Sequence, residues 1–175
     1  MFDGIWSNIF RSRPREDDEE DLIEVLKSTP IFSELSDREV RRIASIAYQR
    51  TFDEGEVIFR EGQTAAGMYI IRRGEVRILK RTPEGEEVVL GELGRGDFFG
   101  EIGLLYKVPR TASAVAKTRC QLIGFFRPEL LDLMDRDPRL AAKLLFHLGR
   151  VLAQRLVQTN EQYERALRRL REVEG

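Results

Sequence analysis

The sequence predicts an α+β protein in which helices flank an antiparallel β-barrel or sandwich. Two changes of periodicity support this prediction. Apolar residues recur at helical spacing before residue 50 and after Arg127, whereas the stretch between them consists of short strand-like runs separated by glycine. Strands at such close spacing imply an antiparallel barrel or sandwich. With 175 residues, 42% of them hydrophobic, the chain is long enough for one globular domain and a modest extension.

Residues 1–20 are expected to form an N-terminal arm with an amphipathic part and an acidic part. Residues 1–13 carry bulky apolar side chains at helical spacing beside two arginines, which suits either a membrane surface or a protein surface. We favour docking on protein, because so short a segment has few basic groups to hold it on lipid. The acidic run "REDDEED" then predicts the solvated first turn of a helix, where carboxylates oppose the positive end of the backbone dipole.

Two short helices are predicted within residues 21–49. The first contains "LIEVLKS" and is stopped by Pro30. The second begins after Ser36, because Ser36 and Glu39 form the S-x-x-E capping pattern ahead of an apolar helical face.

The strands are predicted within residues 50–126 and the C-terminal helices within residues 128–173. The strand-like runs are "TFDEGEVIFREG", "GMYIIRRGEVRILKR", "EEVVLGELGRGDFFG" and "RTASAVAKTRCQLIGFF". Helical periodicity then predicts one helix that ends near Asp137-Pro138 and one long helix from Arg139 to about Val173. The apolar stripe of the long helix exceeds what a single domain covers, and it comprises Leu145, Leu148, Leu152, Leu156, Thr159, Tyr163, Leu167, Leu170 and Val173.

The composition excludes several functional classes. Twenty-nine basic residues face thirty acidic ones, so the net charge of -1 gives no long-range attraction to nucleic acid, and no nucleic acid partner is expected. Cys120 and His147 are the only residues of their types, which argues against a disulfide framework or a zinc site and for two ordinary packed residues. No long apolar run and no secretory signal pattern occur, so a cytoplasmic location is expected. No dinucleotide, P-loop or serine-elbow motif occurs either, so no enzymatic activity and no cofactor are expected.

The stretch "GDFFGEIGLLYKVPRTAS" carries the candidate binding site. Its glycines, among them Gly100 and Gly103, permit the backbone to approach a ligand closely. A short helical turn at "EIGLLY" would direct its first free amides, those of Ile102 and Gly103, at an anion. This part of the stretch therefore predicts an anion site.

Two charged residues of the same stretch refine this prediction. Arg110, placed by the preceding Pro109, can add a charge-assisted contact to the anion. Glu101 would repel an anion, so it is expected to accept hydrogen bonds from a hydroxyl pair such as that of a sugar. A site for both an anion and a sugar describes a nucleotide. The alternative is a simple salt bridge between Glu101 and Arg110.

The run "FFGEIGLLYKVPRTASAVA" resembles the phosphate-binding cassette of the cyclic nucleotide-binding domain family, found in catabolite-activator-type regulators, cyclic nucleotide-dependent protein kinases and cyclic nucleotide-gated channels. The upstream runs "LKSTPIFSELSDREVRRIA" and "FDEGEVIFREGQTAAGMYIIRRGEVRIL" are similar to the first helices and strands of the family. The resemblance spans roughly residues 22–160. It implies an antiparallel β-roll, a jelly-roll-like double-stranded barrel, flanked by N-terminal helices and a long C-terminal helix.

The resemblance also implies roles for individual residues. Glu101 matches the family's acceptor for the ribose 2'-hydroxyl, and Arg110 matches the arginine that neutralises the cyclic phosphate. Gly100, Ile102 and Gly103 match the backbone amide donors. The implied ligand is cAMP or cGMP.

Two hydroxyl residues follow the matched arginine. Ser113 occupies a position where the family often has a hydroxyl that faces the phosphate or the base. Thr111 matches a position where a hydroxyl can favour guanine, although cAMP-responsive members carry serine or threonine there too. The choice between cAMP and cGMP therefore stays open.

The run "LAQRLVQTNE" is similar to the helix of catabolite-activator-type proteins that pairs two subunits and places a threonine against the base. This match implies a homodimer through the C-terminal helix, with Thr159 and Asn160 as candidates for contact with the base. The alternative for Thr159 is a tolerated position in the dimer seam.

The sequence carries neither the DNA-binding helix-turn-helix, the kinase chain nor the membrane spans of the larger family members. We therefore expect a free-standing sensor that acts through dimerisation, through an unknown effector protein or by sequestering the nucleotide. The alternative is a dimeric scaffold of the same fold that needs no ligand.

Overall fold

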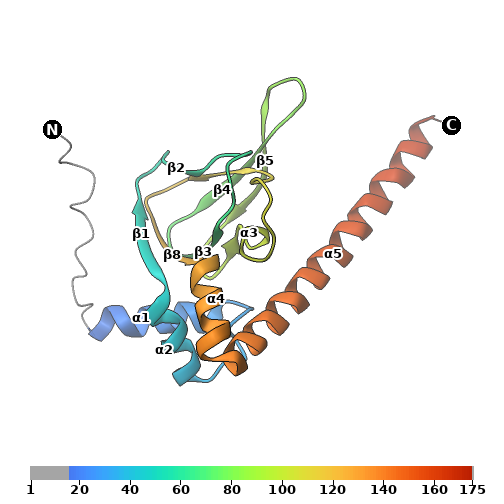
Figure 1. The fold of residues 1–175 in the computed structure, drawn as a ribbon. Helices are drawn as coiled ribbons and strands as arrows, with labels where there is room; N and C mark the ends of the chain where they lie inside the picture. The colour runs from blue at the N-terminus through green and yellow to red at the C-terminus, as the bar shows by residue number, and fades with distance from the viewer. Residues whose placement is uncertain (1–15, 175) are drawn as a thin grey trace.

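The computed structural model describes residues 16–174 and arranges them as an α+β fold with two N-terminal helices, two four-stranded sheets and a long C-terminal helix (Figure 1). The helices are α1 (Glu16–Ser28), α2 (Asp37–Ile46), α3 (Ile102–Leu105), α4 (Arg127–Arg136) and α5 (Pro138–Glu174). The strands are β1 (Tyr48–Phe52), β2 (Val57–Phe59), β3 (Gly67–Arg73), β4 (Val76–Arg81), β5 (Glu87–Leu93), β6 (Phe98–Phe99), β7 (Ser113–Ala116) and β8 (Cys120–Phe126). The amphipathic segment predicted at residues 1–13 lies outside the described residues.

The two sheets form the predicted β-roll. One sheet has the strand order β1-β8-β3-β6 and the other β2-β7-β4-β5, and every pairing is antiparallel. The strand β3 alternates between two cores, as the period of two residues requires. Its Tyr69 and Ile71 belong to the core between the sheets, whereas Met68 and Ile70 belong to the core under the helices. Because β3 is covered on both faces, nearly all of it is buried.

The helices pack on the outer face of the first sheet. Leu26 of α1, Leu130 of α4 and Leu144 of α5 join Met68 and Ile70 of β3 in one core. The helix α2 begins with the predicted capping box, in which the Ser36 side chain accepts from the Glu39 amide and the Glu39 side chain accepts from the Ser36 amide. Cys120 and His147 are both buried, as predicted for ordinary packed residues.

The acidic run at the start of α1 is largely solvated, as predicted, since residues 18–20 are exposed. The run has a second role that the sequence did not predict, because Asp18 and Asp21 both accept hydrogen bonds from Arg72 of β3, at 2.8 and 2.6 Å. The Arg72 side chain is only 3% exposed and also donates to Gln49 of β1. A guanidinium this deeply buried needs several acceptors, so part of the run serves as its counter-charge.

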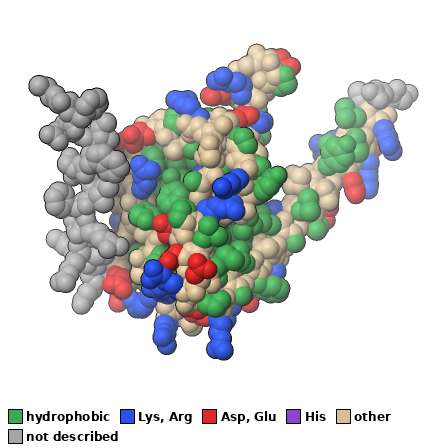
Figure 2. Space-filling view, in the orientation of Figure 1, with side chains coloured by type: hydrophobic (Ala, Val, Ile, Leu, Met, Phe, Trp, Pro, Cys, Tyr) green, Lys and Arg blue, Asp and Glu red, His purple; other side chains and the backbone are tan. Residues whose placement is uncertain are grey.

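The long helix begins at Pro138, close to the predicted boundary, and its first turns are buried through Leu140, Leu144 and Leu148. Figure 1 shows the C-terminal part of α5 extending away from the sheets. Apolar side chains lie exposed along this projecting part (Figure 2), namely Leu156, Val157, Tyr163 and Leu170. Within residues 16–174, no helix is both long enough and apolar enough to span a membrane.

Candidate functional site

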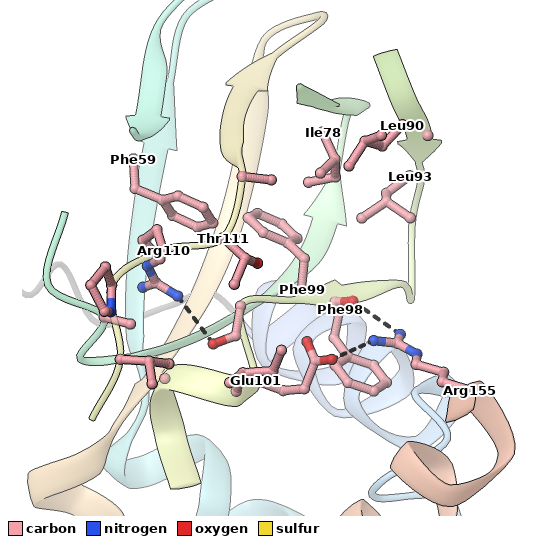
Figure 3. A pocket seen from close by; sticks show the side chains of 18 residues that line it. Phe59, Ile78, Leu90, Leu93, Phe98, Phe99, Glu101, Arg110, Thr111 and Arg155 are labelled. Atoms are coloured by element: carbon pink, nitrogen blue, oxygen red, sulfur yellow. Dashed lines mark hydrogen bonds and ion pairs between the residues drawn. The ribbon is translucent and has the colours of Figure 1, made fainter. Parts of the chain in front are cut away.

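A cavity of about 430 Å³ opens beside α3, between the mouth of the β-roll and α5 (Figure 3). The volume lies within the range of about 300–1,000 Å³ that is typical of small-molecule sites. Six of the nine predicted site residues line it: Gly100, Glu101, Ile102, Gly103, Arg110 and Thr111. The other walls are largely apolar and come from β2, β4, β5 and the segment between β5 and α3, with Phe59, Ile78, Leu90, Leu93, Phe98 and Phe99 among them. Arg155 of α5 also lines the cavity, as do the loop residues Ala65, Val108 and Pro109.

The Arg110 guanidinium is held in a defined place at the cavity wall. Its residue is 8% exposed, and the guanidinium carbon lies 4.0 Å from the centre of the Phe59 ring. One nitrogen, Nη1, donates to the Gly100 carbonyl at 3.0 Å. Burial lowers the pKa of this guanidinium, while the nearby Tyr69 and Glu101 raise it. Arginine stays protonated in proteins, so Arg110 presents a partly desolvated positive charge to the cavity.

Gly100 is required by the position of Arg110. Its φ is +79°, a left-handed backbone conformation that residues other than glycine rarely adopt. A Cβ at this position would lie 2.5 Å from Arg110 Nη1, the same atom that donates to the Gly100 carbonyl. Glycine therefore permits both the turn and the contact with the guanidinium.

The short helix α3 corrects one prediction. The sequence predicts free amides at Ile102 and Gly103, but the Gly103 amide donates to the Gly100 carbonyl at 3.1 Å. The turn starts at Gly100, so this carbonyl takes up the amide that was predicted to be free. Gly103 has another reason to be glycine, because a Cβ there would lie 2.4 Å from the Cβ of Ala65.

The Glu101 carboxylate pairs with an arginine, but not with Arg110. Arg155 Nη1 donates to Glu101 Oε1 at 2.7 Å, and Arg155 Nη2 donates to the Phe98 carbonyl at 3.3 Å (Figure 3). The Arg155 guanidinium also lies 4.3 Å from the centre of the Phe98 ring. Glu101 is 7% exposed, so this partner compensates a nearly buried carboxylate. The alternative of a simple Glu101–Arg110 salt bridge is wrong for this structure.

Sequence reasoning missed Arg155. The residue lies inside the run "LAQRLVQTNE", one helical turn before Thr159 and on the same face of α5. The structure brings Arg155 to the cavity and leaves Thr159 and Asn160 exposed outside its lining. The Thr159 hydroxyl donates to the Arg155 carbonyl at 2.8 Å. That Thr159 and Asn160 touch a base stays a prediction.

The two hydroxyls beyond Arg110 differ in position. Thr111 is exposed at the cavity wall, where it can meet a ligand. Ser113 is the first residue of β7 and is not part of the lining, and its hydroxyl accepts from the Glu61 amide at 2.9 Å. Among residues 16–174, no three His, Cys, Asp or Glu side chains gather as a metal site.

Comparison with known proteins places these residues in a family. The model of the cyclic nucleotide-binding domain matches residues 49–137. The Cyclic AMP receptor protein of Thermus thermophilus is 35% identical over 127 residues, which cover 73% of this chain and 59% of that protein. The chain therefore spans about three fifths of the length of this relative.

Solved structures give the same result. The crystal structure of the Thermus thermophilus Catabolite Activator Protein has a TM-score of 0.72 and 32% identity, over 78% of this chain and 62% of that one. The regulatory subunit of a cAMP-independent protein kinase A from Trypanosoma brucei has a TM-score of 0.64 and 27% identity, over 75% of this chain and 46% of that one. These matches confirm the resemblance seen in the sequence and the β-roll fold.

Proposed function

Because the chain belongs to the cyclic nucleotide-binding domain family, we propose that it is a sensor that binds cAMP or cGMP in the cavity beside α3. One observation carries the proposal. A buried guanidinium, Arg110, and a buried carboxylate, Glu101, line the same cavity without pairing with each other. A positive and a negative side chain that line one cavity without pairing suit a ligand with both an anionic group, for Arg110, and a hydroxyl group, for Glu101.

In this proposal the cyclic phosphate meets Arg110 and the backbone of Gly100 and Ile102. Arg110 is already oriented by Phe59 and by the Gly100 carbonyl, so little ordering remains when the anion binds. Glu101 accepts the ribose 2'-hydroxyl. The apolar walls from β4 and β5 suit the flat face of a base, with Thr111 on the side of the phosphate. Ser113 lies behind this wall and would contribute through its bond to Glu61, not by contact with the phosphate.

Fewer observations bear on the identity of the base. The Thermus relative is named a cyclic AMP receptor protein, which favours cAMP. The Trypanosoma relative is described as part of a cAMP-independent kinase, so membership of the family does not by itself specify cAMP. Thr111 is an exposed residue of the cavity wall, and its hydroxyl is compatible with either base.

We further propose that α5 transmits the signal. Arg155 of α5 contacts the very carboxylate that the ribose would use, so a bound ligand must share or displace this contact. A ligand shifts a conformational equilibrium only through its different affinity for the two states, and the Arg155–Glu101 contact supplies such a difference. The movement of α5 would then be communicated to a second subunit or to an effector protein.

The exposed apolar stripe of α5 supports a homodimer as the functional form. Thr159 and Asn160 lie on this projecting part, and they are proposed to approach the base in the dimer. A dimeric scaffold without a ligand would use the same stripe. The cavity with its two separated charges favours the sensor, because a scaffold has no need of it.

Titration calorimetry with cAMP, cGMP and a cyclic dinucleotide tests the proposal. Arg110→Ala is expected to weaken the binding of the preferred nucleotide at least about tenfold, because a charge-assisted hydrogen bond is lost. The control is Arg81→Ala, which removes an exposed arginine outside the cavity lining and is expected to bind as wild type does. Thermal melting of both variants checks that they are folded.

Two results would contradict the proposal. Unchanged affinity in Arg110→Ala would remove the assigned role of the guanidinium. Absence of binding for every cyclic nucleotide would leave the scaffold as the better account.

A further inference from the structure

The segment that carries Arg110 and Thr111 is also held from outside the cavity, by two charged residues that do not line it. Lys80 of β4 donates to the Thr111 carbonyl at 2.8 Å. The same ammonium donates to Glu61 Oε1 at 2.5 Å. The other carboxylate oxygen of Glu61 accepts from the Arg81 amide at 3.3 Å.

These contacts restrict both backbone dihedrals of Thr111. The Gly62 amide donates to the Arg110 carbonyl at 2.8 Å, which fixes the peptide plane before Thr111. Lys80 binds the Thr111 carbonyl, which fixes the peptide plane after it. Because a residue has only the two soft dihedrals between these planes, the direction of the Cα–Cβ bond of Thr111 is then restrained as well.

Thr111 needs such support because it lies in no strand. β7 begins at Ser113, whose hydroxyl accepts from the Glu61 amide, and the Arg110 amide donates to the Gln63 carbonyl at 2.7 Å. Thr111 and Ala112 therefore bridge two anchored points, and Lys80 holds the bridge by a side chain. Without Lys80, the Thr111 carbonyl would lose this donor and would accept a hydrogen bond from water instead.

The Lys80–Glu61 pair has properties that suit positioning more than stability. Both side chains are about a third or more exposed, at 42% and 32%, so the ion pair itself adds little to the stability of the fold. The pKa of Glu61 is lowered, chiefly by the hydrogen bond from Lys80. Glu61 therefore stays ionised near neutral pH and keeps the ammonium beside the Thr111 carbonyl.

We propose that Lys80 is a positioning residue of the ligand site, which orients Thr111 and the adjacent Arg110 at the cavity wall and is itself held by Glu61. The inference deepens the proposed function and rests on it. Lys80 does not touch the ligand in this account, so its effect reaches the ligand only through the 110–111 backbone.

The test compares three variants by titration calorimetry with cAMP and cGMP and by thermal melting. Lys80→Met keeps the apolar stem and is expected to bind the preferred nucleotide about threefold to tenfold more weakly, as the loss of one hydrogen bond implies. Lys80→Arg can still donate to the carbonyl and is expected to stay within about twofold of wild type. Lys117→Met is the matched control, because it removes a lysine paired with Glu75 and Glu92 away from the cavity.

The outcomes separate the possible explanations. Equal affinity of Lys80→Met and wild type overturns the positioning role and leaves the proposed function intact. Equal losses in Lys80→Met and Lys117→Met, or no rescue by Lys80→Arg, also overturn it, because the effect would then be general. If wild type binds neither nucleotide, the proposed function fails and the inference with it. Should Lys80→Met not melt cooperatively, Lys80→Leu, which also has no donor, replaces it with the same expected weakening.

Discussion

Gly100 connects the conformation of one residue to the position of the charge that we assign to phosphate binding. Its carbonyl accepts from Arg110 Nη1, and its α-carbon has no room for a methyl group on the side of that nitrogen. A substitution at Gly100 would displace the Arg110 guanidinium, and it would affect ligand binding through that displacement. The glycine is therefore part of the site although no side chain is involved.

We predict that Gly100→Ala weakens nucleotide binding more than about tenfold, because the new methyl group displaces the Arg110 guanidinium. The left-handed backbone adds a cost of about 1–2 kcal/mol in the free energy of unfolding. Calorimetry and urea unfolding measure the two effects separately.

Gly85→Ala is the control for the backbone cost. Gly85 has a φ of +92°, and nothing lies within 4 Å of a Cβ built there. The control is expected to lose a similar amount of stability and to keep its affinity. Equal affinity in Gly100→Ala and Gly85→Ala would show that the Gly100 carbonyl does not place Arg110.

At the scale of the elements, the Glu39 side chain of α2 links this helix to the residue that caps its N-terminus and to α5. Glu39 accepts from the Ser36 amide at 2.8 Å and from Lys143 of α5 at 2.6 Å. These bonds, from Lys143 first and then from Ser36, lower the pKa of Glu39 from 4.5 to about 2. The ionised form is therefore bound more strongly in the folded than in the unfolded state.

This shift predicts the pH dependence of stability. A carboxyl whose pKa is lower in the folded state stabilises the fold above the unfolded value of 4.5, and this contribution is lost as the pH falls toward about 2. We predict that Glu39→Gln lowers the free energy of unfolding at pH 6 and flattens its decline between these two values. Urea unfolding at a series of pH values measures the slope.

Lys143→Met tests the largest cause of the shift. It is expected to flatten the same decline to a smaller extent, because the Ser36 bonds to Glu39 remain. An acid limb in Glu39→Gln as steep as in wild type would assign the loss of stability to other carboxyls.

At the scale of the whole molecule, α5 belongs to the domain at one end and extends beyond it at the other. Leu156, Tyr163 and Leu170 recur every seven residues along the projecting part and are each about 60% exposed. A seven-residue apolar repeat is the pattern of a helix that pairs with another helix. The domain itself leaves this face uncovered.

We predict that wild type is a dimer and that the double variant Leu156→Ser with Tyr163→Ser is a monomer, because the apolar seam is lost. Light scattering after size-exclusion chromatography measures the mass. Leu131→Ser on α4 removes another exposed leucine and is expected to stay dimeric. A monomeric wild type, or a dimeric double variant, would exclude pairing through α5.

Local signals in the sequence determined most of the fold. The capping box of Ser36 and Glu39, the stop near Asp137 and the glycine turns all depend on residues a few positions apart, and the structure confirms them. The candidate site was recognisable for the same reason, since Gly100, Glu101 and Arg110 lie within eleven consecutive residues of one cavity wall.

Only the tertiary structure decided which charges meet. Glu101 and Arg155 are 54 positions apart, and Arg72 and Asp21 are 51 apart, so no spacing rule connects them. The path of α5 past the cavity brings Arg155 to Glu101 and leaves Thr159 outside the lining. Periodicity reports which face of an element is apolar, but the partner of a charged side chain depends on how the elements pack, because burial makes an unpaired charge costly wherever its partner lies in the chain.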